Sequence, residues 1–325
     1  MTDFSFYRDL PVLVTGGAGF IGSHLVRGLL QAGARVRVLD NFCNGTRQNL
    51  AEVAGQIEVL EGDITRLEDC QRAAHEQKVV FHLAALGSVP RSVEHPLLYN
   101  QVDAGGTLNM LEAARHAGVK RFVYSASSSA YGDTLVLPKV ETMAPAPKSP
   151  YAVAKLTGEY YVRTYAAVYG VEGVCLRYFN VFGPRQNPQS QYAAVIPAWI
   201  TMLLNNQSPK VYGDGEQSRD FCCVDNVVFA NMLGGSVIGP LNGPTVNIAC
   251  GQSITLNRML KKMQTITGKQ VAATYLPPRM GDVKDSLGDI RAAEVVLGYK
   301  PKVYFDEGLE RTIAWYTKVH TSASA

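Results

Sequence analysis

The stretch Pro11-Val-Leu-Val-Thr-Gly-Gly-Ala-Gly-Phe-Ile-Gly-Ser23 decides the fold. It opens with an apolar run typical of a buried strand, and from Phe20 onward its apolar residues follow helical spacing. The glycines between them allow a tight turn, a close approach of the backbone to a pyrophosphate, and close packing of helix on strand. The N-terminus of the helix would then face the phosphate charge. The stretch therefore predicts a dinucleotide-binding unit of strand, turn and helix.

A carboxylate at the end of the next predicted strand extends this site. Asp40 can accept hydrogen bonds from the adenosine ribose and would repel a 2′-phosphate, which favours NAD over NADP. Asp63 follows the third predicted strand, where it could accept from the adenine amino group or simply cap its loop. The residues predicted to contact NAD in this part of the chain are Gly16, Gly19, Phe20, Ile21, Gly22, Asp40, Asn41, Asp63 and Ile64.

The first half of the chain alternates short apolar runs with helical patterns, which predicts βαβ units and a parallel sheet. Glycines stand where several of the helices would end. The predicted strands are Pro11–Val14, Arg35–Asp40, Ile57–Glu61, Val79–Leu83, Arg121–Ser125 and Gly173–Arg177. The predicted helices are Phe20–Ala32, Leu67–Gln77, Leu97–His116 and Tyr151–Tyr169. We expect an α/β fold with a doubly wound parallel sheet of the Rossmann type.

The pattern changes after Arg185, where loops rich in Gly, Pro, Asn and Asp predominate. Only a strand at Val246–Ile248 and a helix at Thr255–Thr267 stand out. We therefore predict a Rossmann domain over residues 1–180, joined by a later strand near 244–250. Residues 181–325 are predicted to form a smaller, interwoven domain that binds the substrate.

The composition excludes several classes of protein. The chain has 325 residues, of which 46% are hydrophobic and 18% charged, as expected for a packed globular protein. A net charge of +3 without a dense basic stripe argues against nucleic-acid binding as the main function. The cysteines show no C-x-x-C spacing and the histidines no ligand spacing, so we predict no disulfide framework and no metal.

The N-terminus carries Asp3 and Asp9 and lacks the basic and apolar regions of a signal peptide. No stretch approaches the about 18 uninterrupted apolar residues that a spanning helix needs. The sequence therefore predicts a cytoplasmic protein without a membrane span.

A tyrosine and a lysine one helical turn apart suggest acid/base chemistry. Tyr151 and Lys155 would lie one above the other on a single helix face. A free tyrosine has a pKa of about 10, so it becomes a useful base only where positive charges favour the phenolate. Lys155 can supply one such charge and NAD⁺ the other. The serine-rich stretch Ser125–Ser129 lies at the carboxyl end of a predicted strand, where ligands bind in open α/β sheets.

Taken together, these motifs resemble those of the extended short-chain dehydrogenases/reductases that act on nucleotide sugars. The resemblance covers nearly the whole chain. It rests on Thr15–Gly22, His82-Leu-Ala-Ala85, the serine-rich strand end, the Tyr151/Lys155 pair and Arg177–Arg185. It implies that Tyr151 is the acid/base, that Lys155 lowers its pKa and holds the ribose, and that Ser127, or next Ser128, bonds the substrate hydroxyl. It also implies cofactor contacts from Ala84, Tyr151, Lys155 and Tyr178.

The resemblance also narrows the reaction. The 4,6-dehydratases of this family carry an Asp-Glu pair after the catalytic Ser or Thr, where this chain has Ser128 and Ser129. Without carboxylates the elimination of water loses its acid and base, so hydride removal from C4 and hydride return remain. That reaction is an epimerisation through a 4-keto sugar, and the enzyme would be an NAD-dependent isomerase.

The second half resembles that of the UDP-sugar 4-epimerases. Arg219 and Arg279 would grip the diphosphate bidentately, although an arginine at the surface is more often only solvated. The residues that the resemblance assigns to UDP are Asn180, Lys210, Val211, Tyr212, Arg219, Arg279 and Asp282.

Sugar choice depends on the space around C2. In this family a Tyr four residues beyond the Gly-Asp of the last motif tends to exclude an N-acetyl group, and this chain has Ser286 there. The loop Leu86–Ser92 resembles the branch that prefers N-acetylated UDP-hexoses, which adds Gly87, Ser88 and Arg91 to the predicted substrate contacts. The serine-rich strand end supplies Ser127, Ser128 and Ser129.

We therefore predict interconversion of UDP-N-acetylglucosamine and UDP-N-acetylgalactosamine, a reaction of polysaccharide biosynthesis. The alternatives are a UDP-glucose or UDP-uronic acid 4-epimerase and, more distantly, a nonenzymatic Rossmann protein that senses nucleotides. Retention of the Tyr151/Lys155 pair favours catalysis over the last of these. Family members usually pair the helices predicted at Leu97–His116 and Tyr151–Tyr169, which predicts a homodimer.

Overall fold

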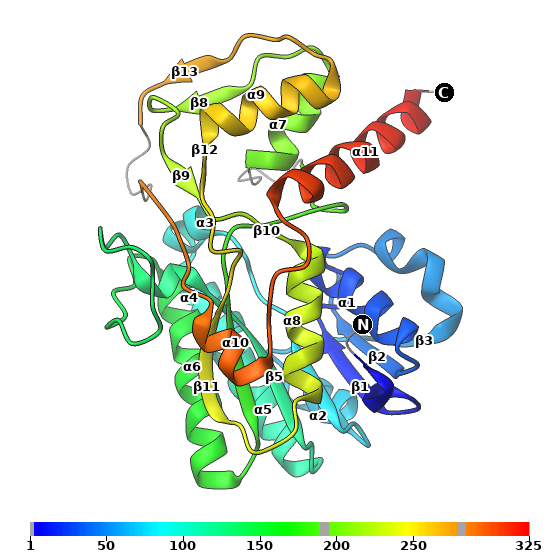
Figure 1. The fold of residues 1–325 in the computed structure, drawn as a ribbon. Coiled ribbons are helices and arrows are strands. Elements are labelled where there is room, and N and C mark those ends of the chain that lie inside the picture. The colour runs from blue at the N-terminus through cyan, green and yellow to red at the C-terminus, as the bar shows by residue number, and fades with distance from the viewer. Residues whose placement is uncertain (1–2, 189–194, 279–283, 325) are drawn as a thin grey trace.

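The computed structural model describes residues 3–188, 195–278 and 284–324 (Figure 1). Its largest sheet has seven strands in the order β11-β6-β5-β4-β1-β2-β3, and every neighbouring pair is parallel. The strands are β1 (Pro11–Thr15), β2 (Arg35–Asp40), β3 (Ile57–Glu61), β4 (Val79–His82), β5 (Arg121–Ser127), β6 (Gly173–Tyr178) and β11 (Asn242–Ile248). The predicted doubly wound sheet is confirmed.

Helices cover both faces of this sheet because its strands are apolar on both sides. Val12 and Val14 of β1 lie in a core that includes residues of α1 (Phe20–Gln31) and α8 (Val224–Ser236). Leu13, which points to the other face, lies in a core with α2 (Leu67–Ala74), α5 (Gly106–His116) and α6 (Pro150–Tyr169). This alternation is expected of a parallel strand buried on both faces.

A third core lies beyond one end of the sheet, in the upper part of Figure 1. Its elements are α7 (Val195–Leu204), β8 (Lys210–Tyr212), α9 (Leu256–Thr267), β13 (Thr274–Leu276) and α11 (Phe305–Ser324). Strands β8 and β13 pair in parallel. The chain therefore crosses between the sheet and this region several times after residue 180.

Short elements complete the described chain. The helical ones are η1 (Ser5–Tyr7), η2 (Arg47–Gln56), α3 (Val89–Glu94), α4 (Pro96–Tyr99), the π-helical η3 (Asn100–Gly105), η4 (Ser128–Tyr131) and α10 (Arg291–Leu297). The short strands pair as β7 (Val181–Phe182) with β10 (Cys222–Cys223), and β9 (Ser218–Arg219) with β12 (Ile254–Thr255). No helix among the described residues is both long enough and apolar enough to cross a membrane.

The main differences from the predicted elements lie just before α5 and after Arg185. The expected helix over Leu97–His116 is divided among α4, η3 and α5. Helix α8 lies where loops were predicted, because it is buried on nearly every side and its apolar residues therefore show no helical period. The predictions at Val246–Ile248 and Thr255–Thr267 are confirmed by β11 and α9.

Candidate active site

The turn between β1 and α1 has the close packing that a dinucleotide requires. A Cβ at Gly22 would come within 2.1 Å of the Gly16 carbonyl oxygen, so only glycine lets α1 lie this close to the turn. Helix α1 begins after Gly19 and has no acidic residue in its first turn. Its N-terminal N–H groups and positive helix end are therefore suited to a pyrophosphate. These residues fit NAD.

The predicted adenosine-binding residues meet at the ends of β2 and β3. Asp40 is buried and accepts hydrogen bonds from Ala18 N at 2.9 Å and from Phe42 N at 2.8 Å. Burial raises the pKa of this carboxyl above its usual value, although both backbone hydrogen bonds oppose the shift. Asn41 Nδ2 donates to Asp63 Oδ2 at 2.8 Å. The two carboxylates thus flank one loop at the edge of the sheet.

Several other predicted cofactor contacts are tied into the structure around them. Asp63 Oδ1 accepts from both N and Oγ1 of Thr65, which is the loop-capping arrangement left open by the sequence. Ile64 is buried in the core beneath α2 and α5. The Ala84 N–H donates to Thr15 Oγ1, and Tyr178 Oη lies 2.9 Å from Ser125 Oγ. A cofactor contact for each of these residues stays a prediction.

Helix α6 holds Tyr151 and Lys155 beside the carboxyl end of β5. Ser149 caps the helix through its side chain. A Cβ at Gly158 would lie 2.2 Å from Tyr124 Oη, so this glycine lets the helix rest directly on β5. The Tyr124 hydroxyl in turn donates to the Lys155 carbonyl oxygen at 3.2 Å. The helix is therefore fixed at the turn that carries the two predicted catalytic groups.

The Lys155 ammonium is buried among groups that suit a positive charge. Its Nζ donates to the Ser125 carbonyl oxygen at 2.9 Å and lies 5.1 Å from the centre of the Tyr124 ring. Burial lowers the pKa of Lys155, whereas the carboxylates of Asp103 and Glu159 raise it. The two carboxylates therefore favour the ammonium form of Lys155, which burial disfavours.

Tyr151 and Ser127 are brought together by a hydrogen bond. Burial raises the pKa of Tyr151 to about 12, and the bond with Ser127 lowers it. Ser127 Oγ accepts from Ser129 Oγ at 2.9 Å and from Ser129 N at 3.2 Å, which leaves its own hydrogen for the Tyr151 oxygen. Ser128 is the first residue of η4. Among the predicted serines, the hydrogen bonding favours Ser127 as the partner of Tyr151.

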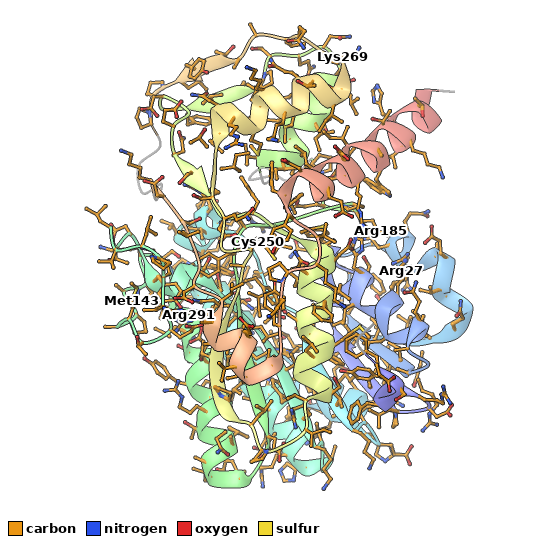
Figure 2. All side chains as sticks on the ribbon, in the orientation of Figure 1. Arg27, Met143, Arg185, Cys250, Lys269 and Arg291 are labelled. Carbon is orange, nitrogen blue, oxygen red and sulfur yellow. The ribbon has the colours of Figure 1, made fainter. Side chains whose placement is uncertain are left out.

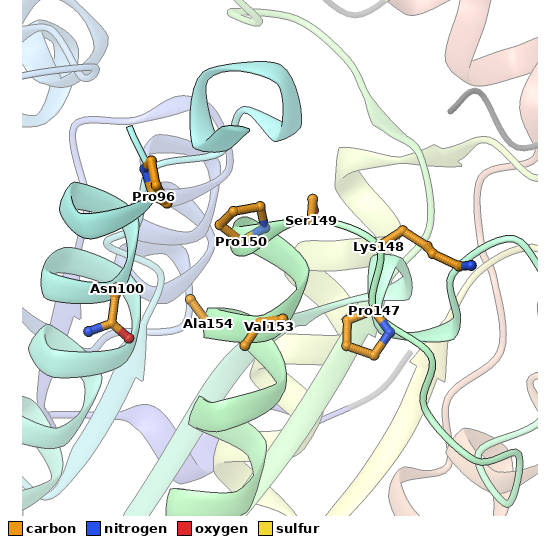
Figure 3. A pocket seen from close by; sticks show the side chains of 8 residues that line it. All are labelled: Pro96, Asn100, Pro147, Lys148, Ser149, Pro150, Val153 and Ala154. Atoms are coloured by element: carbon orange, nitrogen blue, oxygen red, sulfur yellow. The ribbon is translucent and has the colours of Figure 1, made fainter. Parts of the chain in front are cut away.

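A hollow of about 450 Å³ lies near the start of α6, and neither Tyr151 nor Lys155 is among the residues that line it (Figure 3). Pro150, Val153 and Ala154 line it, whereas Tyr151 and Lys155 occupy a different face of the same helix. Pro96 and Asn100 form its other side. This hollow is therefore a feature of the outer surface of α6.

A second cluster of predicted residues meets where the chain crosses to the third core. Asn180 Nδ2 donates to Ser286 Oγ and to the Asp220 carbonyl oxygen, both at 2.9 Å. Ser286 Oγ also accepts from Asp220 N at 3.3 Å. Two residues predicted separately, one for the diphosphate and one for the sugar, are thus adjacent in the structure.

Asp220 holds this crossing together, although the sequence did not single it out. It is fully buried, and its carboxyl accepts from the backbone N–H groups of Cys250, Gly251 and Gly288 at 2.9 to 3.1 Å. Burial outweighs these bonds and raises the pKa of Asp220 to about 6. Figure 2 marks Cys250 at this junction. The available signal was an acidic residue directly before the apolar run Phe221–Val224.

The remaining predicted UDP contacts lie in the same region where they are described. Val211 is buried in the third core, and Lys210 and Tyr212 flank it in β8. Arg219 Nη1 donates to the carbonyl oxygens of Ser218 and Lys284, each at 2.8 Å. Arg279 and Asp282 lie outside the described residues.

The predicted sugar loop forms the start of α3. Ser88 caps this helix, with its Oγ accepting from Arg91 N at 3.3 Å. Hydrogen bonds with Ser88 also lower the pKa of Tyr99, which burial raises. The Tyr99 ring lies edge-on to that of Tyr151, with ring centres 6.4 Å apart. Gly87 and Arg91 are exposed beside this contact. The loop is therefore connected to the acid/base pair through one aromatic residue.

Comparison with protein families agrees with this geometry. The model of the NAD dependent epimerase/dehydratase family matches residues 12–238. The chain belongs to this family. The family model confirms the predicted NAD cofactor, and the similar UDP-sugar 4-epimerases described next confirm the predicted enzyme class, an isomerase.

Individual relatives match this chain over nearly its full length. A UDP-glucose 4-epimerase of Mycolicibacterium smegmatis is 36% identical over 311 residues, covering 94% of this chain and 98% of the relative. A UDP-N-acetylglucosamine 4-epimerase from Methanobrevibacter ruminantium, solved with UDP-N-acetylmuramic acid, is 38% identical with a TM-score of 0.91, covering 96% and 99%. A UDP-glucose 4-epimerase from Thermus thermophilus, solved with NAD, is 35% identical with a TM-score of 0.87, covering 95% and 99%.

Proposed function

We propose that this epimerase-family enzyme interconverts UDP-N-acetylglucosamine and UDP-N-acetylgalactosamine. The observation that carries the proposal is the small Ser286 side chain, whose Oγ lies 2.9 Å from Asn180 Nδ2. A serine at this place leaves room for an acetamido group where a tyrosine would fill the space. The solved relative named as a UDP-N-acetylglucosamine 4-epimerase supports the same substrate.

The acid/base work falls to Tyr151. Its phenolate takes the O4 proton of the sugar in the first half of the reaction and returns it in the second. Ser127 supports this by donating a hydrogen bond to the Tyr151 oxygen, which stabilises the phenolate. Lys155, held by the Ser125 carbonyl oxygen, supplies the positive charge that lowers the tyrosine pKa further.

We assign the binding of NAD and the binding of UDP to different parts of the site. NAD, when bound, would supply the hydride acceptor and donor that inversion at C4 through a 4-keto sugar requires. We assign the sheet half, including the glycine turn and Asp40, to holding the cofactor. The third core and Asn180 hold UDP, so that the sugar can turn about a phosphate linkage without leaving. We assign the pairing with the diphosphate to Arg219, whose Nη1 bonds the Ser218 and Lys284 carbonyl oxygens beside this crossing.

Product analysis by NMR tests the proposal directly. The purified protein would be incubated, without added cofactor, with UDP-N-acetylglucosamine, UDP-glucose or UDP-glucuronic acid in separate samples. We expect the acetylated sugar to be converted fastest to its C4 epimer. Faster conversion of UDP-glucose or the uronic acid would overturn the substrate assignment and keep the epimerisation. Conversion of none of the three would overturn the epimerase proposal and favour a nucleotide-sensing role.

We also propose a homodimer formed through α4 and α6. Val153, Tyr160 and Val168 are at least half exposed and recur every seven or eight residues, so they share one face of α6. Leu97 of α4 is 84% exposed. Light scattering should give twice the chain mass for the native protein and the mass of one chain for Val168→Glu. A native protein with the mass of one chain would overturn this proposal.

A further inference from the structure

Asp103 is a buried acidic residue that the mechanism above does not use. It lies in η3, the π-helical stretch between α4 and α5, and only 1% of its surface is exposed. A π-helical stretch turns the side chains of a helix away from their regular positions, and such stretches are frequent at functional sites. Here η3 packs against α6, the helix that carries Tyr151 and Lys155.

The carboxyl group of Asp103 has one satisfied and one unsatisfied oxygen. Oδ1 accepts a hydrogen bond from Leu86 N at 2.8 Å. Oδ2 is equally inaccessible to solvent but has no hydrogen-bond partner among the described residues. An unpartnered carboxylate oxygen is costly in a protein interior, so its retention needs an explanation beyond packing.

The backbone of Asp103 is fixed by a chain of hydrogen bonds that reaches the glycine turn. The Thr107 hydroxyl donates to the Asp103 carbonyl oxygen at 2.5 Å, and His82 Nε2 lies 3.1 Å from the Thr107 oxygen. On the other side, Thr15 Oγ1 accepts from Leu83 N and lies 2.8 Å from His82 Nδ1. Because the Thr107 hydroxyl donates to Asp103, its oxygen accepts from His82 Nε2, and Nδ1 is left to accept from Thr15. His82 is therefore neutral, with its proton on Nε2. Burial lowers the pKa of His82 to about 3, so this chain carries no charge.

The groups that face Asp103 include both members of the acid/base pair. Lys155 and Tyr151 belong to α6, Tyr99 precedes η3, and Tyr124 belongs to β5; all four interact electrostatically with Asp103. Burial raises the pKa of Asp103 to about 6, and Lys155 lowers it. At neutral pH the side chain is therefore a carboxylate. Its charge raises the pKa values of both Lys155 and Tyr151.

We propose that Asp103 is a positioning residue that sets the charge balance of the acid/base pair. Its carboxylate keeps Lys155 in the ammonium form within a buried site. It also offsets, at the Tyr151 oxygen, part of the stabilisation that this ammonium gives the phenolate. The role of Asp103 rests on the proposed function of Tyr151 and Lys155.

This balance suits a reaction that uses the same group in both directions. A strongly stabilised phenolate would be a weak base toward O4, whereas an unassisted phenol would not ionise at neutral pH. Lys155 helps the phenol to ionise, and Asp103 keeps the phenolate basic enough to accept the O4 proton. The pair of opposite charges therefore holds Tyr151 between the two limits.

The pH dependence of turnover tests the proposal. Asp103→Asn keeps the size of the side chain and an acceptor for the Leu86 N–H but removes the charge. We expect both the acidic and the alkaline limb of the kcat profile to move to lower pH, by about one unit. Glu141→Gln is the matched control, since burial also raises the pKa of Glu141, but its carboxylate accepts from the Asn247 N–H of β11 and is not among the groups that shift the pKa values of Tyr151 and Lys155. Both limbs of the kcat profile of the Glu141→Gln variant should stay at the same pH as in the native enzyme.

A D103N profile that is uniformly lower, with unmoved limbs, would overturn the proposal and leave Asp103 a structural role. A shift of equal size in E141Q would overturn it as well, because any buried carboxylate would then have the same effect.

A stability cycle tests the same charge pair without requiring turnover. Lys155→Met removes the ammonium and leaves the Asp103 carboxylate unpaired, so we expect the urea midpoint to fall more at pH 8 than at pH 5. Adding Asp103→Asn to this variant should restore most of the loss at pH 8. Additive effects of the two substitutions would overturn the proposal. Because the cycle measures unfolding, it gives its answer even where the substrate assays fail and the proposed function is wrong.

Discussion

Asp40 and Asp220 are both buried carboxyls at the edge of the active site, yet they are held in opposite ways. Asp40 accepts from Ala18 and Phe42, which are 22 and 2 residues away along the chain. Asp220 accepts from Cys250, Gly251 and Gly288, which are 30 to 68 residues away. The cofactor half is thus assembled from neighbouring strands and their turns. The sugar half forms only when distant parts of the chain have docked.

This difference has consequences for how the two halves should respond to substitution. A change in the cofactor half should act locally, because each turn is supported by its own strand and helix. A change at the Asn180–Asp220–Ser286 crossing should act on the sugar half, at Ser286 through the space around the sugar and at Asp220 through the docking of the third core. The substitutions below test this distinction.

The largest effect is expected where the halves meet. Tyr151→Phe removes the proton acceptor without removing the ring that packs on Tyr99. Turnover should fall by roughly 100- to 10,000-fold, the usual contribution of a general acid/base, while the thermal midpoint and the bound NAD stay unchanged. Tyr304→Phe, at an exposed tyrosine outside α6, is the control. Full turnover in Y151F would mean that another group carries the proton.

A tyrosine at position 286 should affect the sugar half alone. Ser286→Tyr fills the space beside Asn180 and should lower kcat/KM for UDP-N-acetylglucosamine by about 100-fold, a value typical of steric discrimination. Activity toward UDP-glucose and affinity for NAD should change far less. Ser286→Ala separates the two roles of this residue, since it removes the acceptor for Asn180 but adds no bulk. Equal losses for both sugars in S286Y would refute the steric explanation.

The cofactor half was largely readable from the sequence, and the reason is its locality. The apolar run at Val12–Val14 and the glycine pattern through Gly22 each predict a structure within one βα unit, and both are confirmed. The Tyr151/Lys155 spacing could likewise be placed on one helix face before the structure was known.

The sugar half and Asp103 could not be predicted in the same way. The bond of Ser286 to Asp220 joins residues 66 positions apart, and no local pattern encodes such a contact. The helical spacing of the sequence is interrupted around Asp103, because the π-helical η3 replaces α-helical turns between α4 and α5. Helix α8 has no polar face to reveal its period. Long-range docking and irregular backbone therefore account for most of what the sequence left open.

The pH dependence of stability should expose the Asp220 crossing. Its folded pKa of about 6 lies above the ordinary value of 3.8. The stability that Asp220 contributes is therefore fully present below about pH 4 and is lost as the pH rises through 6, by roughly 3 kcal/mol. Asp220→Asn should remove this component, so urea unfolding curves of the variant and the native protein should approach each other as the pH rises from 5 to 8. Two curves that stay parallel across that range would contradict the raised pKa.

Asp40→Asn gives the smallest expected effect and the sharpest test of local assembly. An amide can accept from only one of the two N–H groups that Asp40 now holds, and it no longer repels a 2′-phosphate. We expect the affinity for NAD to fall by about tenfold, the size of one lost hydrogen bond to a charged group, and the preference for NAD over NADP to narrow. Calorimetric titration with each dinucleotide measures both changes. The KM for the UDP-sugar should not move, since the hydrogen bonds of the Asp40 carboxyl among the described residues come from Ala18 and Phe42 in the cofactor half. If that KM rose as much as the dissociation constant of NAD, the two halves would be coupled, and the contrast between local and long-range assembly would not describe how this active site works.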